Sequence, residues 1–407
     1  MSTFAVHNTV IEQIDKFRKL CLWRGADVNA SQRPKAAWVD VCKSKSEGGL
    51  GVIDLKTQNE ALLLKQLMKF FNKEDIPWVA LIWESYYEAG SLPSMAKKGS
   101  FWWKDILKLL DKFKGLARVN INNAKSCLLW SDMWNDKVPM IAYPELYSFI
   151  KSKNTILAEA KTSDNLLNLF HLPLSQQAFG QLTQLQQDLQ QITLNDNNDF
   201  WTCIWNSGKF TVAKAYRHLK GRRTIHPGFK WIRKSPCQNK HKVFAWLILK
   251  DRLSTRELLR RKNMELPDYN CVLCYQTTEE SVFHLLIGCP FATACWNWLG
   301  LQITHQGELL HCLESFRGQL QVPFFMEIII IMCWTIWQMR NWLIFNSRPP
   351  FITAGKRGIQ IRVCAAFVPH KTKLLSGSGI MVKQPCLICV LELIFFFSFF
   401  CFLSPFC

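Results

Sequence analysis

Apolar residues in the first ninety positions recur at helical spacing. One face of a first helix is marked by Val10, Ile11, Ile14, Phe17 and Leu20, and the Leu-rich segment 59–71 predicts a second helix. Between them lies the sequence Gly48-Gly49-Leu50-Gly51. Because no Gly-Lys-Ser or Gly-Lys-Thr follows it, we expect a tight turn here rather than a phosphate-binding loop.

The middle of the chain combines helix and strand signals. A short helix is expected over residues 101–110 and a strand over residues 126–130. Residues 175–198 are rich in Gln and Asn, with Leu182, Leu185 and Leu189 at helical spacing. This segment is either a surface helix or a linker, and we place a domain boundary in it.

Sharper signals follow this boundary. Residues 200–205 alternate as a strand, residues 206–208 form a turn, and residues 209–212 return, which predicts a β-hairpin. Helices are expected over residues 213–219, 242–249 and 256–262, the last of them capped by Ser254 or Thr255. Residues 324–345 predict a long apolar helix. Its polar residues, such as Glu327 and Arg340, favour a buried core helix over a membrane span.

Positive charge is concentrated in one part of the chain. The whole chain has a formal charge of +19, and residues 209–262 contain seventeen Lys and Arg against two acidic residues. So concentrated a field attracts polyanions, of which nucleic acid is the commonest. The alternative is a solvated surface that keeps the protein soluble.

A set of Cys and His residues has the spacing of a metal site. Cys271, Cys274, His284 and Cys289 form the pattern C-x2-C-x9-H-x4-C, which offers three thiolates and one imidazole to one structural Zn²⁺ ion. Residues 277–280 (Thr-Thr-Glu-Glu) predict a capping box that starts the helix carrying His284. All four coordination positions are filled, so we expect the metal to hold structure rather than to catalyse.

The cysteines also allow other interpretations. The chain has sixteen cysteines, and most of them are scattered as small hydrophobic residues would be. The four could likewise be unconnected buried cysteines and a histidine. The N-terminus carries charges and no apolar run of signal-peptide length, so we expect a reducing compartment, where paired cysteines bind metal more often than they form disulfides.

From Asp199 to Leu299 the chain closely resembles the zinc-binding domain that follows reverse transcriptase in plant LINE-like (non-LTR) retroelements. The matching segments are Trp201 and Trp205, residues 208–212, Ala215-Tyr216, Trp231, residues 240–246 and 251–255, the four ligands, and Trp296. Residues 22–23, 38–42, 48–51, 59–63, 130–134 and 337–341 extend the resemblance from about residue 10 to about residue 346. The resemblance implies a region that follows a polymerase and binds RNA or DNA. Contact of the basic helices at 240–262 with the phosphate backbone would make this binding largely independent of sequence.

The chain also departs from that family. A polymerase palm needs paired aspartates for two metal ions, and this chain has no Asp-Asp pair. Its start leaves no room for a palm, and endonuclease and ribonuclease H segments are not recognised. We therefore expect no enzymatic activity. The tail resembles nothing in the family, and its segment 387–403 has one charge in seventeen residues. A membrane tether and an out-of-context exon are both open interpretations of this segment.

Together these patterns predict an α+β, mainly helical protein with a small zinc-nucleated domain that contains a β-hairpin. The expected regions are 1–90 (helical, post-polymerase), 91–175 (mixed), 176–198 (linker), 199–300 (zinc-binding domain), 301–346 (C-terminal helices) and 347–407 (unrelated tail). The expected nucleic-acid contacts are Lys240, Lys242, Arg252, Arg256, Arg260 and Arg261.

Two other roles stay open. The chain could be a protein-interaction module left from packing on a polymerase, or a membrane-tethered protein. The expected location is the nucleus or the cytoplasm, with membrane attachment only if the tail inserts.

Overall fold

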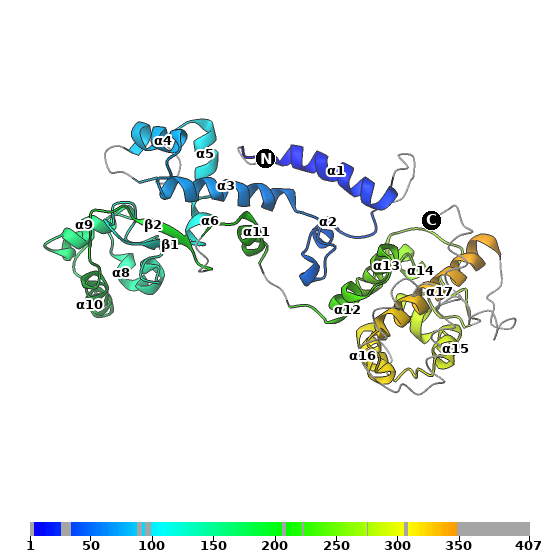
Figure 1. Cartoon of the computed structure of the whole chain (residues 1–407). Helices are drawn as coiled ribbons and strands as arrows, with labels where there is room; N and C mark the ends of the chain where they lie inside the picture. The colour runs from blue at the N-terminus through cyan, green and yellow to red at the C-terminus, as the bar shows by residue number, and fades with distance from the viewer. Residues whose placement is uncertain are drawn as a thin grey trace, which may run out of the picture. The chain divides into compact units, whose positions relative to one another are not determined.

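The computed structural model describes residues 4–25, 34–87, 92–93, 99–205, 209–221, 224–274, 276–304 and 308–347 (Figure 1). Over these residues the fold is mainly helical, as predicted, and it contains one two-stranded sheet. The chain divides into two compact units. Unit 1 consists of Met1–Arg18 and Ile53–Arg222, and unit 2 consists of Lys19–Val52 and Arg223–Cys407.

Unit 1 is built on the long helix α3 (Leu55–Phe71), which starts at Asp54 because that side chain accepts a hydrogen bond from the Thr57 amide. Its core is rich in aromatic residues, among them Trp103, Trp130 and Trp201. Its remaining elements are α1 (Asn8–Arg24, whose last residues belong to unit 2), α4 (Pro77–Tyr87), α5 (Phe101–Leu107), α6 (Leu110–Lys114), β1 (Ala117–Asn120), α7 (Pro139–Ala142), α8 (Pro144–Ser148), α9 (Leu157–Thr162), η2 (Leu166–Leu169), α10 (Gln176–Gln190), β2 (Phe200–Cys203) and α11 (Val212–Lys220).

The predicted hairpin over residues 200–212 is wrong in its second strand. Strand β2 pairs antiparallel with β1, in the register Ala117 with Cys203 and Asn120 with Phe200. The Asn72 side chain makes two hydrogen bonds to the Trp201 backbone. Its Oδ1 accepts from the Trp201 amide at 2.7 Å, and its Nδ2 donates to the Trp201 carbonyl at 3.1 Å. Residue 212 already begins helix α11. These long-range contacts outweigh the local hairpin pattern.

The strand predicted over residues 126–130 is also wrong. This segment forms turns, apart from a single bridge between Leu128 and Ile156. Buried carboxylates fix the turns: Asp199 accepts from the amides of Ala124 and Ser126, and Asp132 accepts from the Leu128 amide. The local structure is therefore set by side chains that a strand pattern does not register.

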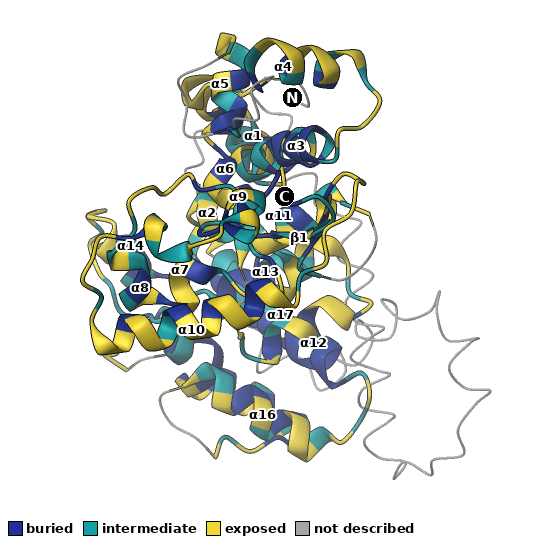
Figure 2. Ribbon diagram, turned by 90° about the vertical axis from the view of Figure 1, so that its left-hand side faces the viewer, coloured by how far each residue is buried: buried dark blue, intermediate teal, exposed yellow. Residues whose placement is uncertain are grey.

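For residues 175–198, the structure has the surface helix rather than a linker over most of the segment. Helix α10 buries Leu182, Leu185 and Leu189 in the unit 1 core, and Figure 2 shows its buried and exposed residues alternating. Helix α11 follows β2 and is anchored to α3, because the Tyr216 hydroxyl accepts from the Asp54 amide and Lys220 pairs with Asp54.

Unit 2 surrounds the long helix α17 (Phe325–Asn346), which is buried along much of its length. Its other elements are α2 (Trp38–Val41), η1 (Lys45–Glu47), α12 (Gly228–Lys234), α13 (Asn239–Leu249), α14 (Arg256–Arg261), the π-helical turn η3 (His284–Gly288), α15 (Pro290–Trp298) and α16 (Leu309–Leu320). The helices predicted near 242–249, 256–262 and 324–345 are confirmed, and Thr255 caps α14 by accepting from the Leu258 amide.

The glycine trio forms the expected tight turn, and it anchors the N-terminal part of unit 2. Gly48 and Gly51 have a positive φ of 74°. A Cβ on Gly49 would lie 2.1 Å from the Lys43 carbonyl oxygen, so only glycine fits there. The Gly48 carbonyl accepts a hydrogen bond of 2.7 Å from Trp246 Nε1 on α13. Residues on both sides of unit 1 in the sequence thus form one core.

Among the described residues, α17 alone is long and apolar enough to cross a membrane, with a mean hydropathy of 1.4 and half of its apolar window buried inside the protein. The hydrophobic segment 387–403 lies outside the described residues.

Candidate metal centre

The four residues of the Cys and His pattern come together in unit 2. Their ligand atoms all lie within 4.8 Å of one another, with Cys271 Sγ 3.9 Å from Cys289 Sγ and Cys274 Sγ 3.4 Å from His284 Nε2. Bonds of about 2.3 Å to sulfur and about 2.0 Å to nitrogen in a zinc tetrahedron put donor atoms about 3.5–3.8 Å apart. The cluster therefore fits one zinc ion.

A short loop carries the first two ligands. Backbone hydrogen bonds close it, from the Cys271 amide to the Thr278 carbonyl and from the Glu280 amide to the Tyr269 carbonyl. The backbone amide of Leu273 donates to the Cys271 sulfur, and Cys274 Sγ contacts the Gln276 carbonyl oxygen at 4.0 Å. An amide donor stabilises a thiolate, which is the form that binds zinc.

The other two ligands lie on the π-helical turn η3 and directly after it. The Cys289 amide donates to the His284 carbonyl, five residues earlier. In an α-helix, residues five apart lie about 140° away from each other around the axis, at about 100° per residue. The wider turn brings His284 and Cys289 to the same side, so the x4 spacing works because this turn is not α-helical.

The π turn leaves carbonyl groups that need partners from outside the turn. Trp296 Nε1 donates to the Leu286 carbonyl at 2.7 Å, and Thr293 Oγ1 donates to the Ile287 carbonyl at 3.2 Å. Both donors lie on α15, whose Trp296 is fully buried against Phe316. Helix α15 thus supports the turn that holds two ligands, and the amides of Phe291 and Ala292 at its start donate to the Cys289 sulfur.

The capping box predicted at residues 277–280 is not formed. The helical turn begins later, and Ser281 Oγ accepts from the His284 amide at 2.9 Å. Glu279 instead forms a bridge with Asn270 that closes the ligand loop, and Glu280 is drawn into the core. The Thr-x-x-Glu pattern considers only neighbouring residues, whereas the residue that binds the Glu280 carboxylate lies on α17, far away in the sequence.

That partner is Arg340. The guanidinium donates to Glu280 through Nη2 at 2.7 Å and through Nε at 3.1 Å, and both side chains are buried. The same carboxylate accepts from the Arg256 amide at the start of α14, and the Arg340 guanidinium lies 4.9 Å from the Trp337 ring centre. This buried ion pair joins α14, the ligand loop and α17. In the sequence, this ion pair was indicated by Arg340, the single basic residue of a mainly apolar helix.

The electrostatics of the ligands favour a bound cation. The hydrogen bond from Cys271 lowers the pKa of Cys289 to about 5, while the same contact and burial raise the pKa of Cys271. Burial also raises the pKa of Cys274. Three thiols crowded around one point cannot all ionise without a positive charge between them, and Zn²⁺ supplies it.

The basic residues expected to meet nucleic acid fall into two groups. Lys240, Lys242 and Arg252 lie on α13 or just after it, with Lys240 and Arg252 exposed. The arginines of α14 form ion pairs. Arg256 pairs with Asp268, Arg260 with Glu279, and Arg261 with Asp251.

Four protein ligands with no open position make this a structural zinc-binding module rather than a catalytic metal site. Residues 210–296 match the family described as zinc-binding in reverse transcriptase. The match runs from the start of α11 to α15 and includes all four ligands. The resemblance found in the sequence is thus confirmed over residues 210–296.

Two curated relatives from Arabidopsis thaliana are similar to the chain. A putative ribonuclease H protein is 22% identical over 374 residues, which cover 85% of this chain and 58% of that protein. An uncharacterized mitochondrial protein is 28% identical over 147 residues, which cover 34% of this chain and 93% of that protein. The chain thus spans somewhat over half of the longer relative. No solved structure matches the chain.

Proposed function

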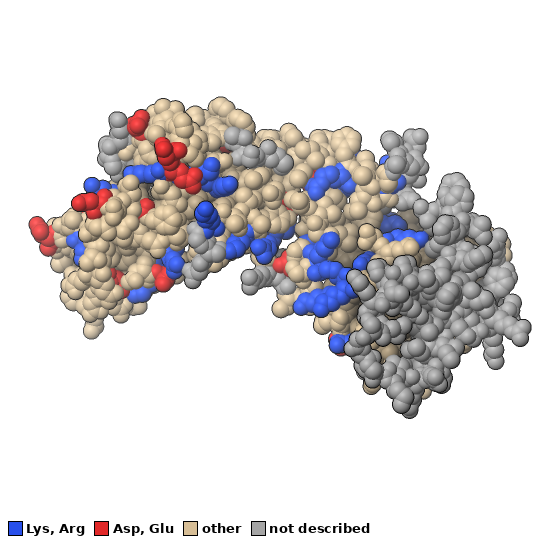
Figure 3. All heavy atoms as spheres, viewed as in Figure 1, with Lys and Arg blue, Asp and Glu red and all other residues tan. Residues whose placement is uncertain are grey.

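We propose that this chain is a non-catalytic protein derived from a LINE-like retroelement, and that it binds RNA or DNA through a basic surface of unit 2. The observation that carries the proposal is the charge of α12 and α13. Residues 224–250 contain six Lys and Arg and no Asp or Glu. Lys230, Arg233, Lys234 and Lys240 are exposed, and Figure 3 shows basic side chains gathered where these helices lie.

The ion pairs of α14 bear on which residues contact phosphate. An arginine paired with a carboxylate must exchange that partner for a phosphate, and its charge is already balanced. We therefore propose α12 and α13, with Lys240, Lys242 and the neighbouring Arg252, as the principal contact surface. Arg256, Arg260 and Arg261 are proposed to contribute less.

Salt dependence tests this proposal. Binding to duplex DNA should weaken steeply as salt rises, and each lost phosphate contact should reduce the log–log slope by about 0.9. We expect a large reduction when Lys230, Arg233 and Lys234 are all changed to Gln. The matched triple change of Arg256, Arg260 and Arg261 to Gln should give a smaller one.

Zinc content is the control in this experiment, because none of the six residues is a ligand. Equal slopes for the two triple variants would contradict the proposal that α12 makes more phosphate contacts than α14. A parent protein that binds no RNA or DNA at low salt would overturn the proposed function.

The absence of catalysis needs its own test, since one relative is named a putative ribonuclease H protein. The chain has no Asp-Asp pair, and the zinc centre has no free position. We expect the purified chain with Mg²⁺ neither to extend a primed template nor to cut the RNA of an RNA–DNA hybrid. Turnover in either assay, retained through a final ion-exchange step, would contradict this part of the proposal.

A protein-interaction role is the second proposal, supported by α1. Val10, Ile14 and Phe17 form a stripe along this helix and are exposed, Phe17 at 68%. If the stripe binds a protein, a captured partner should resist high salt and be lost in Phe17→Ser. Capture that is unchanged in this variant would exclude the stripe.

A further inference from the structure

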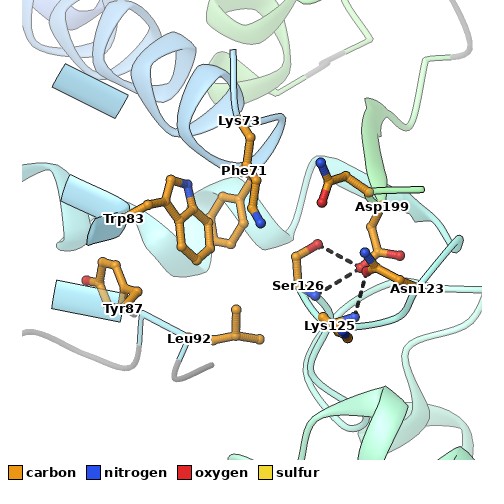
Figure 4. A pocket seen from close by; sticks show the side chains of 10 residues that line it. Phe71, Lys73, Trp83, Tyr87, Leu92, Asn123, Lys125, Ser126 and Asp199 are labelled. Carbon is orange, nitrogen blue, oxygen red and sulfur yellow. Dashed lines mark hydrogen bonds between the residues drawn. The ribbon is translucent and has the colours of Figure 1, made fainter. Parts of the chain in front are cut away.

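Unit 1 contains a cavity of about 170 Å³ that the basic surface of unit 2 does not involve (Figure 4). Its apolar wall consists of Phe71, Trp83, Tyr87 and Leu92, and Asn123, Ser126 and Asp199 lie opposite. The wall is held firmly. The Trp83 ring stacks on Phe70 at 4.4 Å and Trp83 Nε1 donates to the Phe70 carbonyl, while Phe71 stacks on Phe113. The cavity therefore has a rigid apolar wall, which suits the apolar body of a flat ring.

The polar side of the cavity offers hydrogen-bonding groups that the protein does not use itself. Within the described residues, no partner is recorded for the Asn198 side-chain amide or for Asn123 Nδ2. Two side-chain amides can offer both donors and acceptors to the edge of a ring.

The charge of the cavity favours an anionic ligand. Asp199 lines it, but its carboxylate already accepts from three backbone amides and from Ser126 Oγ. Lys73 and Lys125 are exposed at the lining, and Lys73 Nζ lies 4.9 Å from the centre of the Trp83 ring. Glu74 and Asp75 follow Lys73 in the sequence but do not line the cavity. Two ammonium groups beside a flat pocket suit a phosphate next to a ring.

The size of the cavity limits what it can hold. Pockets for drug-sized ligands have about 300–1,000 Å³, so this one has room for a single ring system. A base paired in a duplex is stacked on both faces and cannot enter, whereas a base of a single strand can rotate outward. We propose that this cavity takes one unpaired base of a nucleic-acid strand, with Lys73 and Lys125 near its phosphate. That the ligand is a nucleic acid rests on the proposed function, and the cavity in unit 1 would be a second binding site beside the basic surface of unit 2.

The experiment compares a single strand of about a dozen nucleotides with a duplex of the same sequence, by fluorescence anisotropy at low salt on the full zinc-loaded chain. Asn198→Ala combined with Lys125→Gln should weaken single-strand binding about tenfold and leave duplex binding unchanged. Both side chains are exposed and neither has a recorded partner, so the fold should not change. Lys153→Gln with Asn154→Ala, also exposed and in unit 1, is the matched control.

Photo-crosslinking places the base directly. A strand with one thio-substituted base should crosslink to peptides containing residues 71–87 or 123–126, and the double variant should lose these products. Crosslinks confined to residues 224–347, with binding intact, would overturn the cavity site and leave the proposed function standing. Equal binding by parent and double variant would also overturn it. No binding by either nucleic acid at low salt would overturn both.

Discussion

The pair Glu280–Arg340 gives the sharpest prediction about the zinc module. Arg340→Met keeps most of the side-chain volume on α17 but removes the charge that balances Glu280, whose side chain is fully buried. Breaking a buried pair by removing one partner costs about 3–5 kcal/mol, because the other charge stays in the core without compensation. We expect Arg340→Met to destabilise unit 2 by this amount.

A double-mutant cycle separates the pair from the packing around it. Glu280→Gln keeps an acceptor for the Arg256 amide but carries no charge. Together, Glu280→Gln and Arg340→Met should cost less than the sum of the two single changes, by about 2 kcal/mol or more. The matched control is Arg261→Met, whose ion pair with Asp251 is exposed and should contribute below about 1 kcal/mol.

The assay is urea unfolding of the zinc-loaded protein, followed through release of zinc to a chromogenic chelator. Zinc release reports unit 2 alone, since all four ligands lie in it. A loss below about 1 kcal/mol in Arg340→Met, or strictly additive single changes, would refute the view that this pair holds the ligand loop to α17.

Two further predictions concern unit 2. Freshly prepared, reduced protein should contain about one equivalent of zinc and lose it in Cys274→Ser, and metal analysis that finds none in the parent would contradict the assignment. Burial raises the pKa of Glu327 above its ordinary 4.5, and its Oε2 has no recorded partner among the described residues. The folded state therefore holds this proton more tightly than the unfolded state, and stability falls as pH rises from 4.5 through the raised pKa. Glu327→Gln should add about 1–3 kcal/mol at neutral pH, with the gain shrinking toward pH 4.5 in thermal melts.

The features that could be predicted from sequence are those whose cause lies nearby in the chain. The four ligands were found because their spacing is a local pattern, and α13 and α17 were found because an apolar run fixes a helix. Of the two caps expected for α14, Ser254 or Thr255, the structure has Thr255, and this signal is local for the same reason.

The predictions that failed depend on partners far away in the sequence. Strand β2 pairs with β1, eighty residues earlier at the Asn120–Phe200 pair, and Asn72 clamps Trp201 from α3. Glu280 looked like a helix cap, but Arg340 draws it into the core. The π turn was not predicted either, because its support comes from Trp296 and Thr293 on the next helix. In each case the local pattern favours one structure, but hydrogen bonds to residues far away in the sequence stabilise a different one.

The contact between Gly48 and Trp246 has a consequence for the order of synthesis. The two residues are 198 positions apart, and the pair Glu280–Arg340 spans a further 60. At about 5–20 residues per second, a ribosome needs roughly 10–40 s to make the chain between Gly48 and Trp246. During this time unit 1 can complete its own core, whereas Trp38 and Val41 stay uncovered until helix α13 has been made. Until α13 leaves the ribosome, this early apolar segment stays uncovered, and exposed apolar surface of this kind makes a nascent chain prone to aggregation.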